Sequence, residues 1–163
     1  MMKLYLKQRI FSLGDKYDIY DENENVVFDV SSELFTIGAK LHLCNTNGQE
    51  LYYIKRRFTL FLAQYEIYQN NNLCATINQE LSFLSAKLNV DSCYGNLEIS
   101  GEFLSMDYDI TRDGQYYASV HKKWLSWGDS YEIDIPEAEN AGFICALVIA
   151  IDNCLHNESN SNN

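Results

Sequence analysis

The densest group of cations in this sequence is "YIKRRF" at residues 53–58, and "VHKKW" at 120–124 is the second. Guanidinium and ammonium groups bind phosphate and carboxylate oxygens through charge-assisted hydrogen bonds. Alternation in the two segments predicts that Arg56 and Lys122 face inward with the apolar residues two positions earlier, while their neighbours face outward. The residues that would form a small anion site, for phosphate or a lipid head group, are Arg56, Lys122, Lys55, Arg57 and Lys123.

A structural role is the alternative for Arg56 and Lys122. In that case both cations bond to Asp152 or to a helix end, and the remaining cations form a solvated edge. The choice depends on which end of a helix lies beside them. A C-terminus would make the cations structural caps, because helix carbonyl groups carry partial negative charge. An N-terminus would add free N–H groups and complete an anion pocket.

Other patterns resemble sites but lack residues that the chemistry needs. The segment from Asp21 begins like a calcium loop, yet Val26 stands in the glycine position and Ser32 in that of the bidentate glutamate, so a hairpin turn is expected. His42 and Cys44 would need two more ligands to bind zinc. The sequence contains no P-loop, dinucleotide-binding or nucleophile-elbow motif. We therefore expect no catalytic residue, no metal and no cofactor, although a site assembled from distant residues stays open.

Composition bounds the class of partner. The 163 residues carry a formal net charge of −11 and are 47% hydrophobic. Such a chain can bury a core, and its electrostatic field repels nucleic acid and anionic lipid unless the few cations cluster. We expect no nucleic-acid partner, and peripheral membrane contact through the basic clusters stays an alternative.

Cysteine usage and the N-terminus favour a cytoplasmic location. The five cysteines are an odd number without a C-x-x-C pair, which favours reduced thiols. The opening "MMKLYLKQRIF" has neither a long apolar run nor a small-residue cleavage site. No signal peptide is therefore indicated.

The elements that must hold these side chains repeat along the sequence. Six segments end in an apolar–polar–apolar triplet: 12–19, 36–43, 60–67, 83–90, 103–110 and 126–133. The first apolar residues of the triplets recur at intervals of 20 to 24 residues, and four of the six are tyrosine. Period-two alternation predicts a strand in each segment.

A turn and a second strand follow most of these segments. Turns rich in Asn, Asp and Gly precede the strands expected at 26–30, 51–55, 73–77, 96–100 and 116–120. With 3–7, they predict twelve short strands in up-and-down order. A single hairpin cannot bury an apolar face, whereas a closed barrel can do so and has no free edge.

One segment is apolar on every side. From Ala141 to Ile151 no residue is charged, yet the run is shorter than the roughly 20 residues that a transmembrane helix needs. A helix of this kind, if soluble, must be buried all round. We predict a central helix over 140–156, entered either with Pro136 in its first turn or with Asn140 as the cap before Ala141. Its expected core residues are Phe143, Ile144, Leu147, Val148 and Ile151.

These patterns together resemble the tubby C-terminal-like superfamily and, more narrowly, the LURP-one-related family. The resemblance is carried by the hairpin "GDKYDIYDENENVVFDV", the repeated Tyr-x-Ile strands, "YEIDIP" and the final "AGFICALVIAIDNCLH". It covers residues 3–156 and implies a twelve-stranded barrel threaded by the C-terminal helix. Relatives of this fold include tubby proteins, which bind phosphoinositide head groups, and phospholipid scramblases. This chain departs from scramblases in lacking a Pro-rich N-terminal arm and a cysteine-dense run, and from tubby proteins in its negative charge.

We therefore expect a mainly β protein with a single tubby-like barrel domain over 1–156 and a disordered polar tail over 157–163. The expected function is a non-catalytic binding or scaffolding module for an unknown protein or a small anionic ligand. The alternative is a membrane-associated protein that binds phospholipid head groups, or another small anion, through a basic barrel mouth. Both rest on site chemistry, because a fold alone does not determine function.

Overall fold

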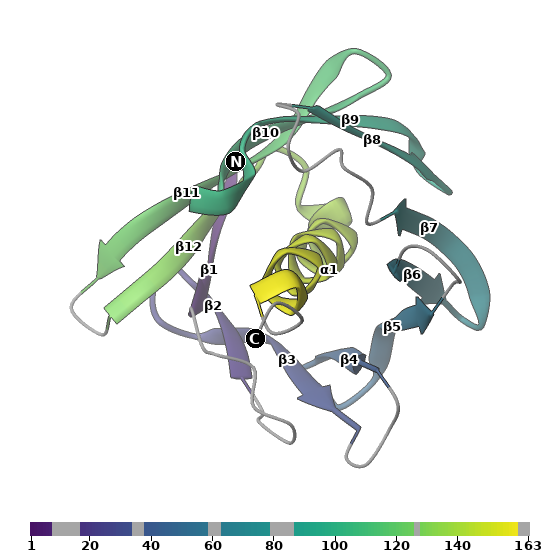
Figure 1. The fold of residues 1–163 in the computed structure, drawn as a ribbon. Helices are drawn as coiled ribbons and strands as arrows, with labels where there is room; N and C mark the ends of the chain where they lie inside the picture. Colours follow the sequence, from purple (N-terminus) through teal and green to yellow (C-terminus); the bar gives the residue numbers. More distant parts are fainter. Residues whose placement is uncertain (8–16, 34–37, 59–62, 79–86, 126–127, 160–163) are drawn as a thin grey trace.

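The structure, a computed structural model, describes residues 1–7, 17–33, 38–58, 63–78, 87–125 and 128–159. Within these residues it has twelve strands and one long helix (Figure 1). The strands are β1 (Met2–Lys7), β2 (Tyr17–Asp21), β3 (Val26–Ser32), β4 (Lys40–Asn45), β5 (Glu50–Phe58), β6 (Ala63–Gln69), β7 (Asn72–Asn78), β8 (Lys87–Ser92), β9 (Gly95–Glu102), β10 (Asp107–Arg112), β11 (Gln115–Leu125) and β12 (Gly128–Ile135). The helices are α1 (Ala141–Ser159) and two short 3-10 helices, η2 (Phe103–Ser105) and η3 (Ala138–Asn140).

The strands form a closed antiparallel barrel around α1. Each strand pairs with its neighbours in the chain, and β1 closes the ring by pairing with both β12 and β2. Figure 1 shows α1, in yellow-green and yellow, at the centre of the ring. The prediction of an up-and-down barrel around a buried C-terminal helix is confirmed.

The sequence repeat corresponds to a repeat of backbone geometry. In four hairpins a β-bulge follows the second apolar residue of the triplet: at Ile19/Tyr20, Leu43/Cys44, Ile67/Tyr68 and Ile110/Thr111. Bulges increase the twist of a strand pair, which helps a sheet to curl into a barrel. The apolar triplet residues with described side chains are buried: Ile19, Leu41, Leu43, Tyr65, Ile67, Leu88, Val90, Tyr108, Ile110, Tyr131 and Ile133.

The segment that begins like a calcium loop is a hairpin turn, as expected. The Asp21 carboxylate accepts hydrogen bonds from the backbone N–H groups of Asn23 and Asn25, both at 2.8 Å. Hydrogen bonds from Asn25 and Asn23 lower the pKa of Asp21. The Asn45 side chain holds the next hairpin turn in the same way, with N–H groups of Asn47 and Gln49 at 3.0 Å. The Asp and Asn residues at these positions therefore serve the turns.

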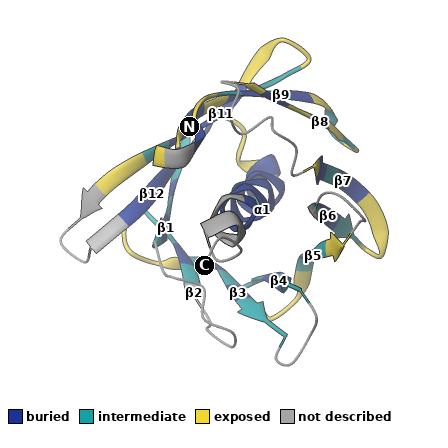
Figure 2. Cartoon of the chain, in the orientation of Figure 1, coloured by how far each residue is buried: buried dark blue, intermediate teal, exposed yellow. Residues whose placement is uncertain are grey.

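The helix α1 fills the lumen. Every residue from Phe143 to Ile151 is fully buried, and Figure 2 shows the described part of the α1 ribbon largely in dark blue. The helix starts at Ala141 directly after η3, which is the second of the two predicted starts. It continues to Ser159, so the tail predicted from 157 is helical for three further residues, which include no Gly or Pro to stop it. The rest of that tail, 160–163, lies outside the described residues.

The barrel wall is least continuous between β7 and β8. In the described residues these strands meet at one pair, Ala75 and Ser92. A disulfide between Cys74 and Cys93 joins them beside that pair, with Cα atoms 4.8 Å apart. The expectation that all the cysteines are reduced thiols is therefore wrong for this pair, whose members become neighbours only when the strands meet. The other three cysteines form no disulfide among the described residues: Cys44, Cys145 and Cys154.

Candidate functional site

The barrel has two different ends. At the turn end, short hairpin turns such as 45–50 and 112–115 surround the first turn of α1, and Gly142 lies against Tyr52. At the opposite end, here named the loop end, the last turns of α1 meet tyrosines near the beginnings of β6 and β12. Tyr65 donates a hydrogen bond to the Asn153 carbonyl at 3.2 Å, and Tyr131 donates one to the Asp152 carboxylate at 3.3 Å.

Two of the predicted anion-binding cations are held by a carboxylate on the outer face of β6. Arg57 Nη1 lies 3.1 Å and Lys55 Nζ 3.4 Å from Glu66, whose other hydrogen-bond donor is the Tyr68 hydroxyl at 2.8 Å. Burial of Glu66 opposes ionisation, but hydrogen bonds from Tyr68 and Arg57 outweigh it and lower the pKa of Glu66. Arg57 and Lys55 are therefore already paired with a carboxylate of the protein itself, Glu66.

A matching arrangement occupies the outer face of β12. Lys3 and Lys123 lie 2.9 and 3.5 Å from the Glu132 carboxylate. Burial again opposes ionisation, and hydrogen bonds from Lys3 and Tyr5 outweigh it, so the pKa of Glu132 is lowered. Lys123, the third of the outward cations, thus belongs to a second carboxylate cluster rather than to an open site.

Arg56 and Lys122 occupy the loop end, on the inner face that the alternation predicted. They pair in register with Tyr65 and Tyr131, whose hydroxyl groups reach the C-terminal part of α1. Because β5 and β11 are six strands apart in a ring of twelve, the two cations stand on opposite walls. The helix end beside them is the C-terminus, so the free N–H groups that would complete the predicted anion pocket lie at the other end of α1. Arg56 Nε is itself buried without a hydrogen-bond partner among the described residues. The five predicted cations do not converge on one pocket.

The tyrosines of the triplets form a polar layer around the helix end. Besides Tyr65 and Tyr131, this layer includes Tyr108, whose hydroxyl is buried without a hydrogen-bond partner in the described part of the chain. Burial and the nearby Asp152 carboxylate raise the pKa of Tyr108 well above its usual value. The repeat thus uses Tyr rather than Leu where O–H donors meet the carbonyl and carboxylate groups at a helix C-terminus.

At the turn end an aromatic cluster covers the first turn of α1. The Tyr94 and Tyr52 rings lie 4.5 and 6.0 Å from the Phe143 ring, between centroids. Tyr94 donates to the Gln69 side-chain oxygen at 3.3 Å, and Gln69 Nε2 donates to Tyr52 at 3.1 Å. The Tyr52 and Tyr94 hydroxyls are 2.7 Å apart, and since the Tyr94 proton is already used, Tyr52 is the donor. Each hydroxyl in this cluster is therefore satisfied.

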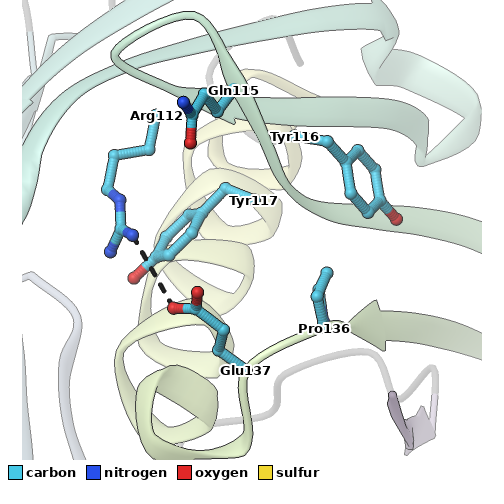
Figure 3. Close-up of a pocket in the computed structure, with 6 residues that line it drawn as sticks. All are labelled: Arg112, Gln115, Tyr116, Tyr117, Pro136 and Glu137. Atoms are coloured by element: carbon cyan, nitrogen blue, oxygen red, sulfur yellow. Dashed lines mark ion pairs between the residues drawn. The ribbon is translucent and has the colours of Figure 1, made fainter.

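Beside this cluster a small cavity of about 40 Å³ opens between the β10–β11 turn and the segment after β12 (Figure 3). The Arg112 guanidinium lies 4.4 Å from the centre of the Tyr117 ring, and its Nη2 is 3.7 Å from the Glu137 carboxylate. Glu137 also accepts a hydrogen bond from the Asn140 side chain at 3.0 Å. The residues that line the cavity are Arg112, Gln115, Tyr116, Tyr117, Pro136 and Glu137.

The chemistry of this cavity, here named the Arg112 pocket, suits an oxyanion. The Tyr117 hydroxyl is buried and has no hydrogen-bond partner among the described residues. Burial raises the pKa of Tyr117 to about 12, against the opposing charge of Arg112, so the hydroxyl keeps its proton at neutral pH. A buried water needs about 10–15 Å³ of such volume, so 40 Å³ admits a few waters or one carboxylate or phosphoryl group. Both donors complement such a group.

The sequence analysis missed these residues. Arg112 lies in "RDG", whose composition indicates a turn, and Tyr117 lies in the strand predicted at 116–120. One feature of the sequence could have indicated Arg112 as a site residue. It lies at a turn on the end of the barrel where the chain enters the helix through "IPE". To use this feature one must know how β11 and β12 pair, and the spacing of residues in the sequence does not give that register.

Fold and site together define a class of protein, a closed β-barrel whose lumen is filled by its own C-terminal helix. The LURP-one-related family model matches residues 2–152, and the chain belongs to this family. A relative is the uncharacterised protein YxjI of Bacillus subtilis, 31% identical over 158 residues that cover 97% of this chain and 96% of the relative. The resemblance drawn from the sequence is therefore confirmed.

A solved structure supports the same architecture. The X-ray structure of an Arabidopsis thaliana protein matches this chain with a TM-score of 0.65 and 16% identity, over 93% of this chain and 90% of that chain. At this identity the likeness concerns the fold alone. Across the described residues, no helix combines the length and apolar character required to cross a bilayer.

Proposed function

We propose that this protein is a non-catalytic binding module that recognises an anionic group, a carboxylate or a phosphate, at the Arg112 pocket. The observation that carries the proposal is the pairing of two donors in one small cavity. Among the described residues the buried Tyr117 hydroxyl has no hydrogen bond of good geometry, and the Arg112 guanidinium, stacked over the Tyr117 ring, meets a carboxylate at no less than 3.7 Å. A buried hydroxyl left unsatisfied costs about 1–3 kcal/mol, which a bound oxyanion would recover.

The position of Glu137 supports an exchangeable site. Its carboxylate, more than half exposed, is the internal anion nearest to Arg112, at 3.7 Å. This distance exceeds that of a direct hydrogen bond, so an external anion can replace Glu137 without breaking a short one. By contrast, Arg57 and Lys3 lie 3.1 and 2.9 Å from carboxylates that are nearly buried.

The filled lumen supports recognition at the surface. Because α1 occupies the centre of the barrel, a ligand meets the protein at the Arg112 pocket with one charged group while the rest of it stays outside. A partner protein with an exposed carboxylate or phosphate group meets this description, and such a partner would fit a scaffolding role. Phospholipid head groups carry the same chemistry and are the second source of the anion.

The experiment is thermal unfolding with inorganic phosphate or acetate as the probe. We expect both anions to raise the melting temperature of the parent, since a ligand at 100 times its Kd adds about 2.7 kcal/mol. Arg112→Gln should lose this response. Lys87→Gln is the matched control, because Lys87 lies on the outer wall, pairs with Glu98 and is well exposed.

Sedimentation with vesicles of anionic and of neutral phospholipid separates the two sources of the anion. Phosphate stabilisation without vesicle binding identifies a soluble ligand or partner. Capture from the native cell, with the parent and Arg112→Gln as separate baits, then shows which bound molecule depends on Arg112. Binding to anionic vesicles that Arg112→Gln loses identifies the head group. A parent that responds to neither anion, or an Arg112→Gln variant that responds as the parent does, contradicts the proposal.

A further inference from the structure

The seam between β7 and β8 differs from the ladders on both sides of it. β6 pairs with β7 from Gln64–Asn78 to Gln69–Asn72, and β8 pairs with β9 from Lys87–Ser100 to Ser92–Gly95. Between β7 and β8 the described residues give one ladder pair and a backbone hydrogen bond of 2.6 Å from Cys93 to Cys74. Closure of the barrel at this seam therefore depends strongly on the disulfide.

The two cysteines differ in their exposure to solvent. Cys93 lies in the exposed turn between β8 and β9, whereas Cys74 is 4% exposed and belongs to the core. Cys93 is therefore the member of the pair that a thiolate nucleophile from solvent can reach, with Cys74 Sγ as the buried leaving group.

The seam is also linked to the helix. Tyr94 follows Cys93 directly, packs on Phe143 of α1 at 4.5 Å and shares the hydroxyl hydrogen bond with Tyr52 at 2.7 Å. A change in the position of Cys93 relative to β7 therefore acts on the cluster that covers the first turn of α1.

We propose that Cys74–Cys93 is a redox-active disulfide that a dithiol reductant reduces in the folded protein, and that its reduction opens the β7–β8 seam. A thiolate of the dithiol attacks Cys93 Sγ, the S–S bond breaks, and the electron pair leaves on Cys74 Sγ, which takes up a proton. The second thiol of the dithiol then attacks the mixed disulfide and releases Cys93 as a thiolate, which also takes up a proton. The disulfide gains two electrons and two protons, and the dithiol becomes a cyclic disulfide.

The test uses the whole chain, oxidised and then treated with dithiothreitol, with thiol alkylation and mass spectrometry to follow reduction. We expect reduction of the folded protein at least tenfold faster than global unfolding, measured by pulse proteolysis under the same conditions. Hydrogen exchange should become at least tenfold faster across 72–78 and 87–94, and should stay unchanged in β11 and β12, where the ladder is long.

Two variants complete the design. Cys93→Ser should exchange like the reduced parent and should not respond to dithiothreitol, whereas Cys44→Ser, which alters a free thiol on β4, should respond as the parent does. If Cys93→Ser does not fold, the reduced parent itself supplies the comparison. Reduction only at the rate of global unfolding, unchanged protection of the seam after reduction, or failure of oxidised glutathione to re-form the bond in the folded chain would overturn the proposal. None of these results depends on Arg112.

Discussion

The two ends of the barrel meet opposite ends of the same helix, and their side chains differ accordingly. At the loop end, the hydroxyl groups of Tyr65 and Tyr131 donate to a carbonyl and a carboxylate of α1. At the turn end, Glu137 supplies a carboxylate just before the helix begins. A helix leaves carbonyl groups unpaired at its C-terminus and N–H groups unpaired at its N-terminus. The hydroxyl donors at the C-terminal end follow from that polarity, whereas at the N-terminal end Glu137 accepts a hydrogen bond from the Asn140 side chain.

The polarity of the helix also separates the cations into two groups. Arg56 and Lys122 stand beside the C-terminal end of α1, where positive charge is favoured by the helix dipole. Arg112 stands at the turn end, where the dipole favours negative charge, and its nearest anion is Glu137. An external anion is therefore better accommodated at the turn end, and substitutions at the two ends should differ in their effects.

The largest expected effect is at the turn end. Phe143→Ala removes a fully buried ring that the Tyr52 and Tyr94 rings contact, and should reduce the free energy of unfolding by about 3–5 kcal/mol. Urea denaturation measures it. Leu73→Ala is the control, because Leu73 is more than half exposed and should change stability by less than about 0.5 kcal/mol. A Phe143→Ala loss as small as the control's would mean that the cluster does not hold the helix start.

At the loop end, hydrogen bonds should matter more than ring volume. Tyr131→Phe keeps the ring but removes a donor to the buried Asp152 carboxylate, and should cost about 1–3 kcal/mol. Urea denaturation at neutral pH measures the change. A Tyr131→Phe variant as stable as the parent would show that the hydroxyl layer is not needed at the C-terminal end of α1.

The carboxylate clusters on the outer wall should make stability sensitive to acid. The folded-state pKa values of Glu66 and Glu132 lie below the usual 4.5. The stabilisation from such groups is complete above the unfolded-state pKa and is lost as the pH falls through the folded-state pKa. Stability should therefore decrease as the pH drops below about 4.5.

Substitution of Glu66 isolates one cluster. Glu66→Gln should lower stability at neutral pH by about 1 kcal/mol, a modest value because Arg57 and Lys55 are partly solvated, and should flatten the acid limb of the stability curve. Glu98→Gln is the matched control, since Glu98 pairs with a single well-exposed lysine. Equal pH curves for the two variants would place the acid sensitivity elsewhere in the molecule.

Much of this architecture was predictable because it depends on periodic patterns. The spacing of the triplets gave the strands, and the uncharged run from Ala141 to Ile151 required a barrel around it. Turn residues such as Asp21 identified the hairpins through their own side-chain hydrogen bonds. Local chemistry and the need to bury apolar surface were sufficient for the fold.

The site was less predictable because its residues come together only when the strands close into a ring. Arg56 and Lys122 have equivalent places in the repeat, yet equivalent places three repeats apart lie on opposite walls of a ring of twelve. The register pairs them with the inward-facing Tyr65 and Tyr131, although Lys122 is exposed, and the alternation could not show which helix end they meet. Arg112 and Tyr117 form a pocket only with Glu137, across the ends of β10, β11 and β12. Contacts of this kind arise from register and ring geometry, which the sequence pattern does not encode directly.

The smallest expected effect is at Tyr108, and it sharpens the contrast with Tyr131. Both tyrosines belong to the loop-end layer, but the Tyr108 hydroxyl is buried without a hydrogen-bond partner in the described residues. Removal of an unsatisfied hydroxyl is close to neutral or stabilising. Tyr108→Phe should therefore lower the free energy of unfolding by less than about 0.5 kcal/mol, or raise it. Urea denaturation beside Tyr131→Phe measures it. A loss above about 1 kcal/mol would mean that a buried water satisfies this hydroxyl, and the layer would then hold the helix end through solvent as well as through direct bonds.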